Sequence, residues 1–180
     1  MKKAMKKLLK NPSIMKILAK IFGQFKEAFY NQQYAEYRKK YNLDPTFNFN
    51  GEGIFFYGDG KIQCGKNSYI GRYSSIQAED GRQVFIGNNV AISHFVMIYT
   101  ATRDARHGFY KDAEIKKGDV FIKDNSWIGA RVFIKEGITI GENSVVGANA
   151  VVTKDIPSNC VAGGVPARVL YYKEDVNTNV

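Results

Sequence analysis

The chain has 180 residues, 44% of them hydrophobic, and a formal net charge of +9 at pH 7. This length suits one domain with an appendage, and two cysteines are too few for a disulfide framework. No apolar run approaches the roughly 18 residues of a membrane-spanning helix, and the basic N-terminus lacks the apolar core and cleavage site of a signal peptide. We therefore expect a cytoplasmic protein.

The positive charge is concentrated in one segment. Residues 1–26 contain eight lysines and no acidic residue, which leaves 18 basic and 17 acidic residues in the rest of the chain. A nucleic-acid-binding protein spreads its basic residues over one face, with aromatic or polar side chains among them. The remainder of the chain shows no such pattern, so we expect no nucleic-acid partner.

Residues 1–45 are predicted to form a basic helical segment. Apolar residues recur at helical spacing from Ile14 to Phe29, and Asn11–Ser13 is expected to interrupt the helix. Tyrosines continue the stripe as far as Tyr41. Two interpretations stay open: the stripe packs on the rest of the protein or on a neighbouring subunit, or residues 1–26 lie as an amphipathic helix on an anionic membrane.

A repeat of six residues dominates the second half of the chain. A branched aliphatic residue, called an anchor below, recurs at Ile122, Ile128, Ile134, Ile140, Val146 and Val152. A period of six fits neither a helix nor a simple strand, and it predicts an all-β solenoid whose coils have three short sides. Anchors should point inward and stack. Glycine follows three of them, and we expect each such glycine to form a corner with a positive φ.

The same register extends towards the N-terminus. Earlier anchors are Cys64, Ile70, Ile76, Ile86, Ile92 and Ile98. An insertion, Ala78–Gln83, breaks the count. We expect Cys64 to have a packing role. The solenoid domain is predicted to span residues 46–172, followed by a tail at 173–180, and the polar residues 102–119 should project from it as a loop.

Four sequence motifs make the chain similar to a known family. They are Asn125–Ala130, Ile138–Ala148, Val152–Pro157 and Gly164–Arg168. With the repeat, they resemble the hexapeptide-repeat acyltransferases, in the branch of maltose, galactoside, nodulation-factor and surface-polysaccharide O-acetyltransferases. The resemblance covers about residues 62–172. It implies a left-handed parallel β-helix, a hand that the spacing could not show because ordinary parallel crossovers are right-handed.

The resemblance also implies a homotrimer with acetyl-CoA bound in each groove between neighbouring subunits. The residues that match the family's cofactor site are Trp127, Gly129, Ala130, Ala148, Thr153, Lys154 and Arg168. Trp127 would line the pantetheine channel, and the backbone groups of Ala130 and Ala148 would meet the pantetheine amides. Thr153 and Lys154 would lie towards the adenine and phosphate end, and Arg168 would bind a phosphate. For Trp127, Lys154 and Arg168, a plain packing or surface role is the alternative.

In this family a histidine acts as general base on the acceptor hydroxyl, but this chain has Arg103 at the matching position. Arginine stays protonated and cannot be the base. The remaining histidines are His94 and His107. His107 could supply the base from the loop, with Asp104 orienting it. His94 could line the acceptor cleft or be an ordinary surface or interface residue, and Arg103 could bind an anionic acceptor or assist the oxyanion. Candidate sugar contacts are Tyr73, Ser75 and Tyr99.

The resemblance predicts an acetyl-CoA-dependent O-acetyltransferase that acts by direct transfer on a sugar or surface-polysaccharide acceptor. Two alternatives stay open: an amino-sugar or antibiotic N-acetyltransferase, and a weakly active or inactive CoA-binding β-helix protein. A zinc-dependent carbonic anhydrase shares the fold but needs three histidines per metal. This chain has two histidines in all, so no metal is expected.

Overall fold

The computed structural model describes residues 11–104 and 114–174. The chain divides into two compact units, one ending at Glu36 and the other beginning at Tyr37. Helix α2 (Pro12–Tyr41) contributes to both units. Within the described residues, no helix combines the length and the apolarity needed to cross a lipid bilayer.

Helix α2 begins where the sequence predicted an interruption. The side-chain Oδ1 of Asn11 accepts hydrogen bonds from the backbone N–H groups of Ser13 and Ile14, at 3.0 and 3.4 Å. Asn11 therefore caps the helix, and Pro12 occupies the first helical position, where its missing N–H costs nothing. The shorter helix that we expected before Asn11 falls outside the described residues.

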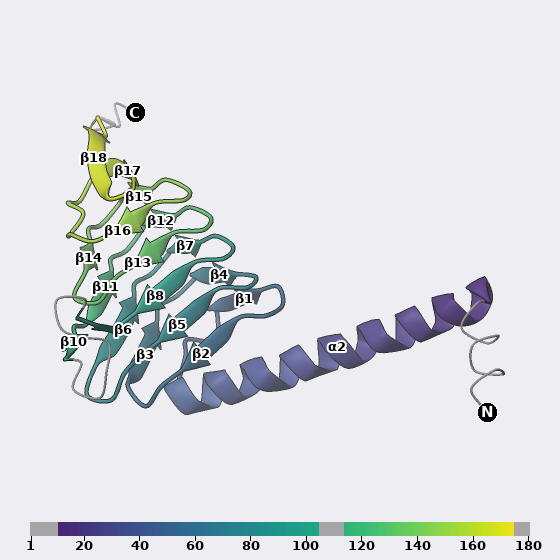
Figure 1. Cartoon of the computed structure of the whole chain (residues 1–180). Helices are drawn as coiled ribbons and strands as arrows, with labels where there is room; N and C mark the ends of the chain where they lie inside the picture. The colour runs from purple at the N-terminus through teal and green to yellow at the C-terminus, as the bar shows by residue number, and fades with distance from the viewer. Residues whose placement is uncertain (1–10, 105–113, 175–180) are drawn as a thin grey trace. The chain divides into compact units, whose positions relative to one another are not determined.

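Three parallel sheets form the faces of a β-solenoid of about four turns (Figure 1). Sheet A contains β1 (Asn48–Asn50), β4 (Tyr69–Gly71), β7 (Ala91–Ile92), β12 (Trp127–Ile128), β15 (Val145–Val146), β17 (Cys160–Gly164) and β18 (Ala167–Tyr172). Sheet B contains β2 (Phe55–Tyr57), β5 (Ser75–Gln77), β8 (Met97–Tyr99), β13 (Phe133–Ile134) and β16 (Val151–Val152). Sheet C contains β3 (Lys61–Cys64), β6 (Gln83–Ile86), β11 (Val120–Ile122) and β14 (Thr139–Ile140). Up to β16, the strands of these three sheets follow one another along the chain in the order A, B, C, which confirms the predicted solenoid.

The anchors form the core, as predicted. In sheet A, Ile70 pairs with Ile92, Ile92 with Ile128, and Ile128 with Val146. All four of these side chains are fully buried. Equivalent columns run through sheets B and C, and the buried Cys64 lies in the column of Ile86. Burial raises the pKa of the Cys64 thiol, which supports a packing role for this residue.

The predicted reason for the glycines was wrong. None of the glycines directly after an anchor has a positive φ. A Cβ on Gly87 would instead lie 2.2 Å from Oδ1 of Asp124, and a Cβ on Gly129 would lie 2.6 Å from the backbone N of Ala148. These glycines are required because the next coil approaches the backbone too closely for a side chain.

The left-handed residues at two corners of each coil lie three positions after an anchor. Between sheets C and A they are all asparagines, namely Asn67, Asn89, Asn125, Asn143 and Asn159, with φ from 53° to 59°. Asparagine is the side chain that best tolerates this conformation after glycine. Neighbouring asparagines also bond to each other, for example Asn89 Nδ2 to Asn125 Oδ1 at 3.2 Å. This corner therefore carries a ladder of amide side chains.

Both ends of the solenoid are covered. At the first coil, Tyr37 of α2 stacks on Phe56 with ring centroids 5.3 Å apart, and Tyr41 packs edge-on against the same ring. At the last coil, β17 and β18 form an antiparallel hairpin with a bulge between Val161 and Ala162. Capping in this way keeps the outermost strands from offering open edges to other chains.

Candidate active site

The exposed Trp127 lies on sheet A, beside the edge of the solenoid where each coil turns from sheet A to sheet B. Trp127 lies on β12 between the smaller side chains Ala91 and Val145 of the adjacent strands. Its side chain is 53% exposed, and its indole N–H donates a hydrogen bond to Ser93 Oγ at 3.3 Å. A large aromatic side chain is thus held on the surface in a defined orientation, which is unusual for a residue whose only role is packing.

Two backbone N–H groups are available at this edge. Among the hydrogen bonds of residues 11–104 and 114–174, none uses the N–H of Ala130 or of Ala148. At the equivalent place after strand β14 of sheet C, the N–H of Glu142 is bound by Ser158 Oγ. The two alanines occur in adjacent coils, because Asn149 N–H donates to Ala130 O at 2.8 Å. An extended ligand that carries amide carbonyls could therefore accept hydrogen bonds from both.

His94 lies on the same edge and has a defined tautomer. Its Nδ1 accepts a hydrogen bond from the backbone N–H of Arg72 at 3.1 Å. Neutral imidazole has one donor and one acceptor nitrogen, so the proton of His94 lies on Nε2. In this state Nε2 can donate a hydrogen bond but cannot accept a proton, which disfavours His94 as a general base. His94 is half-buried and comes directly after Ser93, whose Oγ accepts the hydrogen bond from Trp127.

Three bulky residues with positive φ form a column along this edge. They are Tyr73, Phe95 and Arg131, with φ of 57°, 59° and 58°. The rings of Tyr73 and Phe95 stack with centroids 5.3 Å apart, and the Arg131 guanidinium carbon lies 5.9 Å from the centre of the Phe95 ring. Tyr73 also donates a short hydrogen bond to Glu52. Phe95 and Arg131 were not singled out from the sequence, although both stand three residues after an anchor, in the register of the corner asparagines.

Arg103 and Asp104 lie at a different edge of the solenoid, after strand β8. We call this segment the arm, and its described residues are 101–104 and 114–119. Strands β9 (Ala101–Arg103) and β10 (Ile115–Lys117) pair antiparallel, with Ile115 opposite Arg103. This pair stands where a loop was expected. Arg103 is exposed, whereas Asp104 is buried and forms an ion pair with Lys116 at 3.2 Å. His107 falls outside the described residues.

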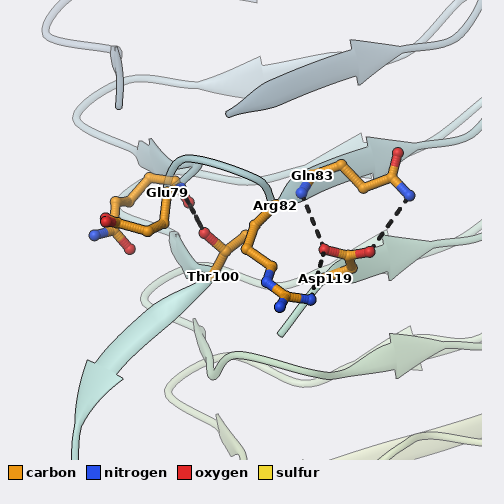
Figure 2. Close-up of polar contacts among 6 residues, drawn as sticks. Glu79, Arg82, Gln83, Thr100 and Asp119 are labelled. Atoms are coloured by element: carbon orange, nitrogen blue, oxygen red, sulfur yellow. Dashed lines mark hydrogen bonds and ion pairs between the residues drawn. The ribbon is translucent and has the colours of Figure 1, made fainter. Parts of the chain in front are cut away.

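The insertion that interrupts the repeat supports the base of this arm (Figure 2). The backbone N–H of Glu79 donates to Thr100 Oγ1 at 2.8 Å, and the backbone N–H of Gln83 donates to Asp119 Oδ1 at 3.1 Å. In addition, Lys117 Nζ forms an ion pair with Glu79 Oε1 at 3.2 Å. Residues 79–83 therefore form hydrogen bonds and an ion pair at both ends of the arm, with Thr100 on one side and with Lys117 and Asp119 on the other.

A buried acid also contacts the arm and was missed in the sequence. Glu136 is 8% exposed, accepts a hydrogen bond from Thr102 Oγ1 at 2.9 Å and forms an ion pair with Lys135 at 2.7 Å. A glutamate before Gly137 is typical of a solvated turn, so its burial had no sequence signal. The hydrogen bond from Thr102 links this carboxylate to the arm.

The other predicted residues are dispersed. Ser75 and Tyr99 lie on the outer side of sheet B, where Tyr99 packs edge-on against Phe133 at 5.5 Å. Burial and the hydrogen bond with Tyr99 raise the pKa of Tyr57 to about 12. Thr153, Lys154 and Arg168 are exposed near the C-terminal end of the solenoid. The predicted residues therefore do not form one cluster within a single chain.

Comparison with known proteins agrees with this geometry. A family model described as bacterial transferase hexapeptide (six repeats) matches residues 119–154. The galactoside O-acetyltransferase of Escherichia coli K12 is 39% identical over 117 residues, which are 65% of this chain and 57% of that relative. This chain thus spans less than two thirds of that relative. A maltose O-acetyltransferase structure from Clostridium difficile 630 is 36% identical, with a TM-score of 0.55 and 72% of each chain covered. The chain belongs to the hexapeptide-repeat acetyltransferases, in the galactoside and maltose O-acetyltransferase branch.

Another structure of a hexapeptide-repeat acetyltransferase contains a bound ligand. It comes from Vibrio cholerae, is complexed with acetyl coenzyme A, and is 27% identical to this chain, with a TM-score of 0.66 over 93% of this chain and 92% of that one. The edge with Trp127, Ala130 and Ala148 offers an exposed aromatic surface and two available amide N–H groups, which are groups that could hold such a ligand. Among the described residues, no group of three or more histidine, cysteine, aspartate or glutamate side chains could hold a metal ion.

Proposed function

We propose that this hexapeptide-repeat acetyltransferase transfers the acetyl group of acetyl-CoA directly to a hydroxyl of a sugar or surface-polysaccharide acceptor. The observation that carries the proposal is the edge built by Trp127, Ala130 and Ala148. The tryptophan can pack along pantetheine, and the two N–H groups can bind its amide carbonyls. Arg168, exposed on β18, would bind a phosphate of CoA through its guanidinium group.

His107 is the proposed general base. It would take the proton of the acceptor hydroxyl as the oxygen attacks the thioester carbonyl, and the CoA sulfur would leave and be protonated. Arg103 cannot take this proton, and the tautomer of His94 leaves Nε2 as a donor. The Nε2–H of His94 would instead donate to the acceptor or to the oxyanion that develops during attack. In the sequence, His107 falls between Asp104 and Glu114, the two residues at which the described part of the arm ends.

A complete site would need two copies of the chain. Within one solenoid, the edge with Trp127 and the arm with Arg103 lie at opposite ends of strand β8 (Met97–Tyr99). A groove between neighbouring subunits would bring the first edge of one copy towards the arm of the next. A closed ring of three identical subunits can make such a contact between two different surfaces. We therefore propose a homotrimer with a site at each interface.

The test is thiol release from acetyl-CoA with a panel of galactosides, maltose and amino sugars. Both cysteines of the protein are buried, so the folded enzyme should give little background with a thiol reagent. We expect acceptor-dependent release with at least one hydroxyl sugar, confirmed by mass spectrometry of the product, and a loss of at least about 100-fold in kcat for His107→Ala. Light scattering should give the mass of a trimer.

The other outcomes would contradict parts of the proposal. If only amino sugars are acetylated, the enzyme is an N-acetyltransferase. If calorimetry shows CoA binding but no sugar is acetylated, the chain is a CoA-binding β-helix protein. Arg103, which stands in the place of the family's catalytic histidine, is the reason for testing this outcome. If CoA does not bind and Trp127→Ala changes nothing, the proposed donor site is wrong.

A further inference from the structure

The first unit of the chain has an exposed apolar face that its own residues leave uncovered. On helix α2, the side chains of Phe22, Phe25 and Phe29 are 70%, 71% and 63% exposed. Met15, Ile17, Leu18 and Ile21 are exposed as well, by 42–59%. Single exposed apolar residues are ordinary, but a contiguous set of this size marks an interaction surface. We call the seven side chains named above, which lie between Met15 and Phe29, the apolar face.

The apolar face is wide. With 3.6 residues per turn, the positions from Ile17 round to Met15 cover an arc of about 160°, and the exposed Lys16, Lys20 and Glu27 occupy the opposite side. A coiled-coil seam uses only two of every seven positions and is narrower. Within the helix, the exposed aliphatic and phenylalanine side chains end at Phe29, and Asn31, Gln32 and Gln33 follow shortly after it. The shape of the apolar face therefore suits a broad apolar medium better than a seam with another helix.

The charge of the segment argues in the same direction. Helix α2 contains the acids Glu27 and Glu36 against six basic residues, which are Lys16, Lys20, Lys26, Arg38, Lys39 and Lys40. Two copies of the helix would place base against base in either the parallel or the antiparallel orientation, because both ends are basic. The preceding residues 1–10 add five lysines and no acid. The complementary partner is therefore a surface of negative charge.

We propose that residues 12–29 of α2 dock on an anionic lipid surface. The helix would lie in the plane of the interface with Phe22, Phe25 and Phe29 among the acyl chains, and Lys16 and Lys20 would face the phosphate groups. Amphipathic helices with large apolar side chains on one face and lysines on the other bind membranes in this way, through apolar burial and attraction to acidic headgroups. The proposal does not depend on the acetyl acceptor or on the catalytic base.

Sedimentation with vesicles tests the proposal on the full-length chain. We expect the protein to bind vesicles of phosphatidylcholine with about 30% phosphatidylglycerol at low salt, and to bind pure phosphatidylcholine at least about ten-fold more weakly. Binding should weaken as salt rises, because the attraction is screened within about one Debye length. The variant Phe22→Ser/Phe25→Ser should lose binding, and Lys16→Gln/Lys20→Gln should reduce it about ten-fold or more.

Two matched variants control for composition. Lys61→Gln/Lys66→Gln removes the same charge from exposed positions of the solenoid, and Phe55→Ser removes an exposed phenylalanine of β2. Both should bind as the wild type does. The chain has one tryptophan, so Trp127→Phe/Phe25→Trp carries a single fluorescent reporter on the apolar face. Its emission should shift to shorter wavelength with anionic vesicles and stay unchanged without them.

Circular dichroism and thermal unfolding should show that all variants fold, since the substituted side chains are exposed. The proposal is overturned if the wild type does not bind anionic vesicles, or if the two solenoid controls lose binding as strongly as the helix variants. It is also overturned if Phe22→Ser/Phe25→Ser dissociates an oligomer of the free protein and the emission of the tryptophan reporter is already shifted before lipid is added. That result would identify a second copy of the chain as the occupant.

Discussion

Asp119 accepts two hydrogen bonds from Gln83, a residue 36 positions earlier in the chain. The backbone N–H of Gln83 lies 3.1 Å from Oδ1, and its side-chain amide lies 3.5 Å from Oδ2. Arg82 approaches the same carboxylate at 3.9 Å. The irregular insertion and the end of the arm are thus one hydrogen-bonded unit.

Replacing Asp119 should loosen this unit. We expect Asp119→Ala to lower the free energy of unfolding by about 1–2 kcal/mol, because the N–H of Gln83 loses its acceptor. If the arm carries the base, kcat should also fall while the affinity for CoA stays unchanged. Urea unfolding and calorimetry with CoA measure the two effects. Asp80→Ala is the control, since Asp80 lies in the same insertion and makes no hydrogen bond or ion pair within the part of the chain that the structure describes. An equal loss in both variants would argue against this role of Asp119.

The contribution of the hydrogen bond between Arg72 N–H and His94 Nδ1 to stability can be measured with two substitutions of His94. His94→Ala leaves the N–H of Arg72 without an acceptor and should destabilise the fold by about 1 kcal/mol. His94→Asn places an amide oxygen near the position of Nδ1 and should recover most of that loss, as measured by urea unfolding. If the asparagine variant is as unstable as the alanine variant, the bond contributes nothing.

Arg103 stands at the position of the family's catalytic histidine, and replacing it with histidine gives a prediction for kcat. With His107 as base, Arg103→His should leave kcat within about ten-fold of the wild type, because a base supplies about 10²–10⁴ only where none is present. Steady-state kinetics with the best acceptor measures it. A gain of about 100-fold or more would mean that the natural enzyme works without an efficient base.

Two glycines in neighbouring coils should respond differently to the same substitution. A Cβ on Gly129 would lie 2.6 Å from the N of Ala148, whereas a Cβ on Gly147 would lie 3.5 Å from its nearest neighbour, Ala162 O. We expect Gly129→Ala to cost about 2 kcal/mol or more and Gly147→Ala less than about 1 kcal/mol. Urea unfolding of the two variants compares them, and similar losses would show that close approach is not what selects glycine here.

The buried Cys64 predicts a loss of stability in alkali. Burial raises its pKa in the folded protein, so the unfolded chain releases this proton first. The contribution is therefore fully present below the ordinary thiol pKa of about 8.5, and it falls by about 1.4 kcal/mol per pH unit above that value until the raised folded pKa is reached. The difference in unfolding free energy between the wild type and Cys64→Ala should be constant from about pH 6 to 8 and shrink from about pH 8.5 to 10. A difference that stays constant throughout would contradict the assignment.

Much of the fold was accessible from the sequence because the solenoid has a local code. One inward side chain every six residues is enough to define three sides of a coil, so Ile122, Ile128 and Ile134 already predict sheets C, A and B. The corners were less well predicted. Asn125 and its equivalents stand three residues after an anchor and adopt the positive φ of the corner. This spacing is visible in the sequence, but the positive φ was assigned to the glycines that follow the anchors.

The sequence by itself determined the repeat, its core and the family, because each depends on spacing within a few residues. Only the tertiary structure decided the chemical state of His94, the available N–H groups of Ala130 and Ala148, the support of the arm by Asp119 and the burial of Glu136. Each of these depends on a neighbour in another coil, between 18 and 36 residues away along the chain. Stacking of coils brings such residues together through backbone geometry, and no local pattern encodes which polar atom meets which.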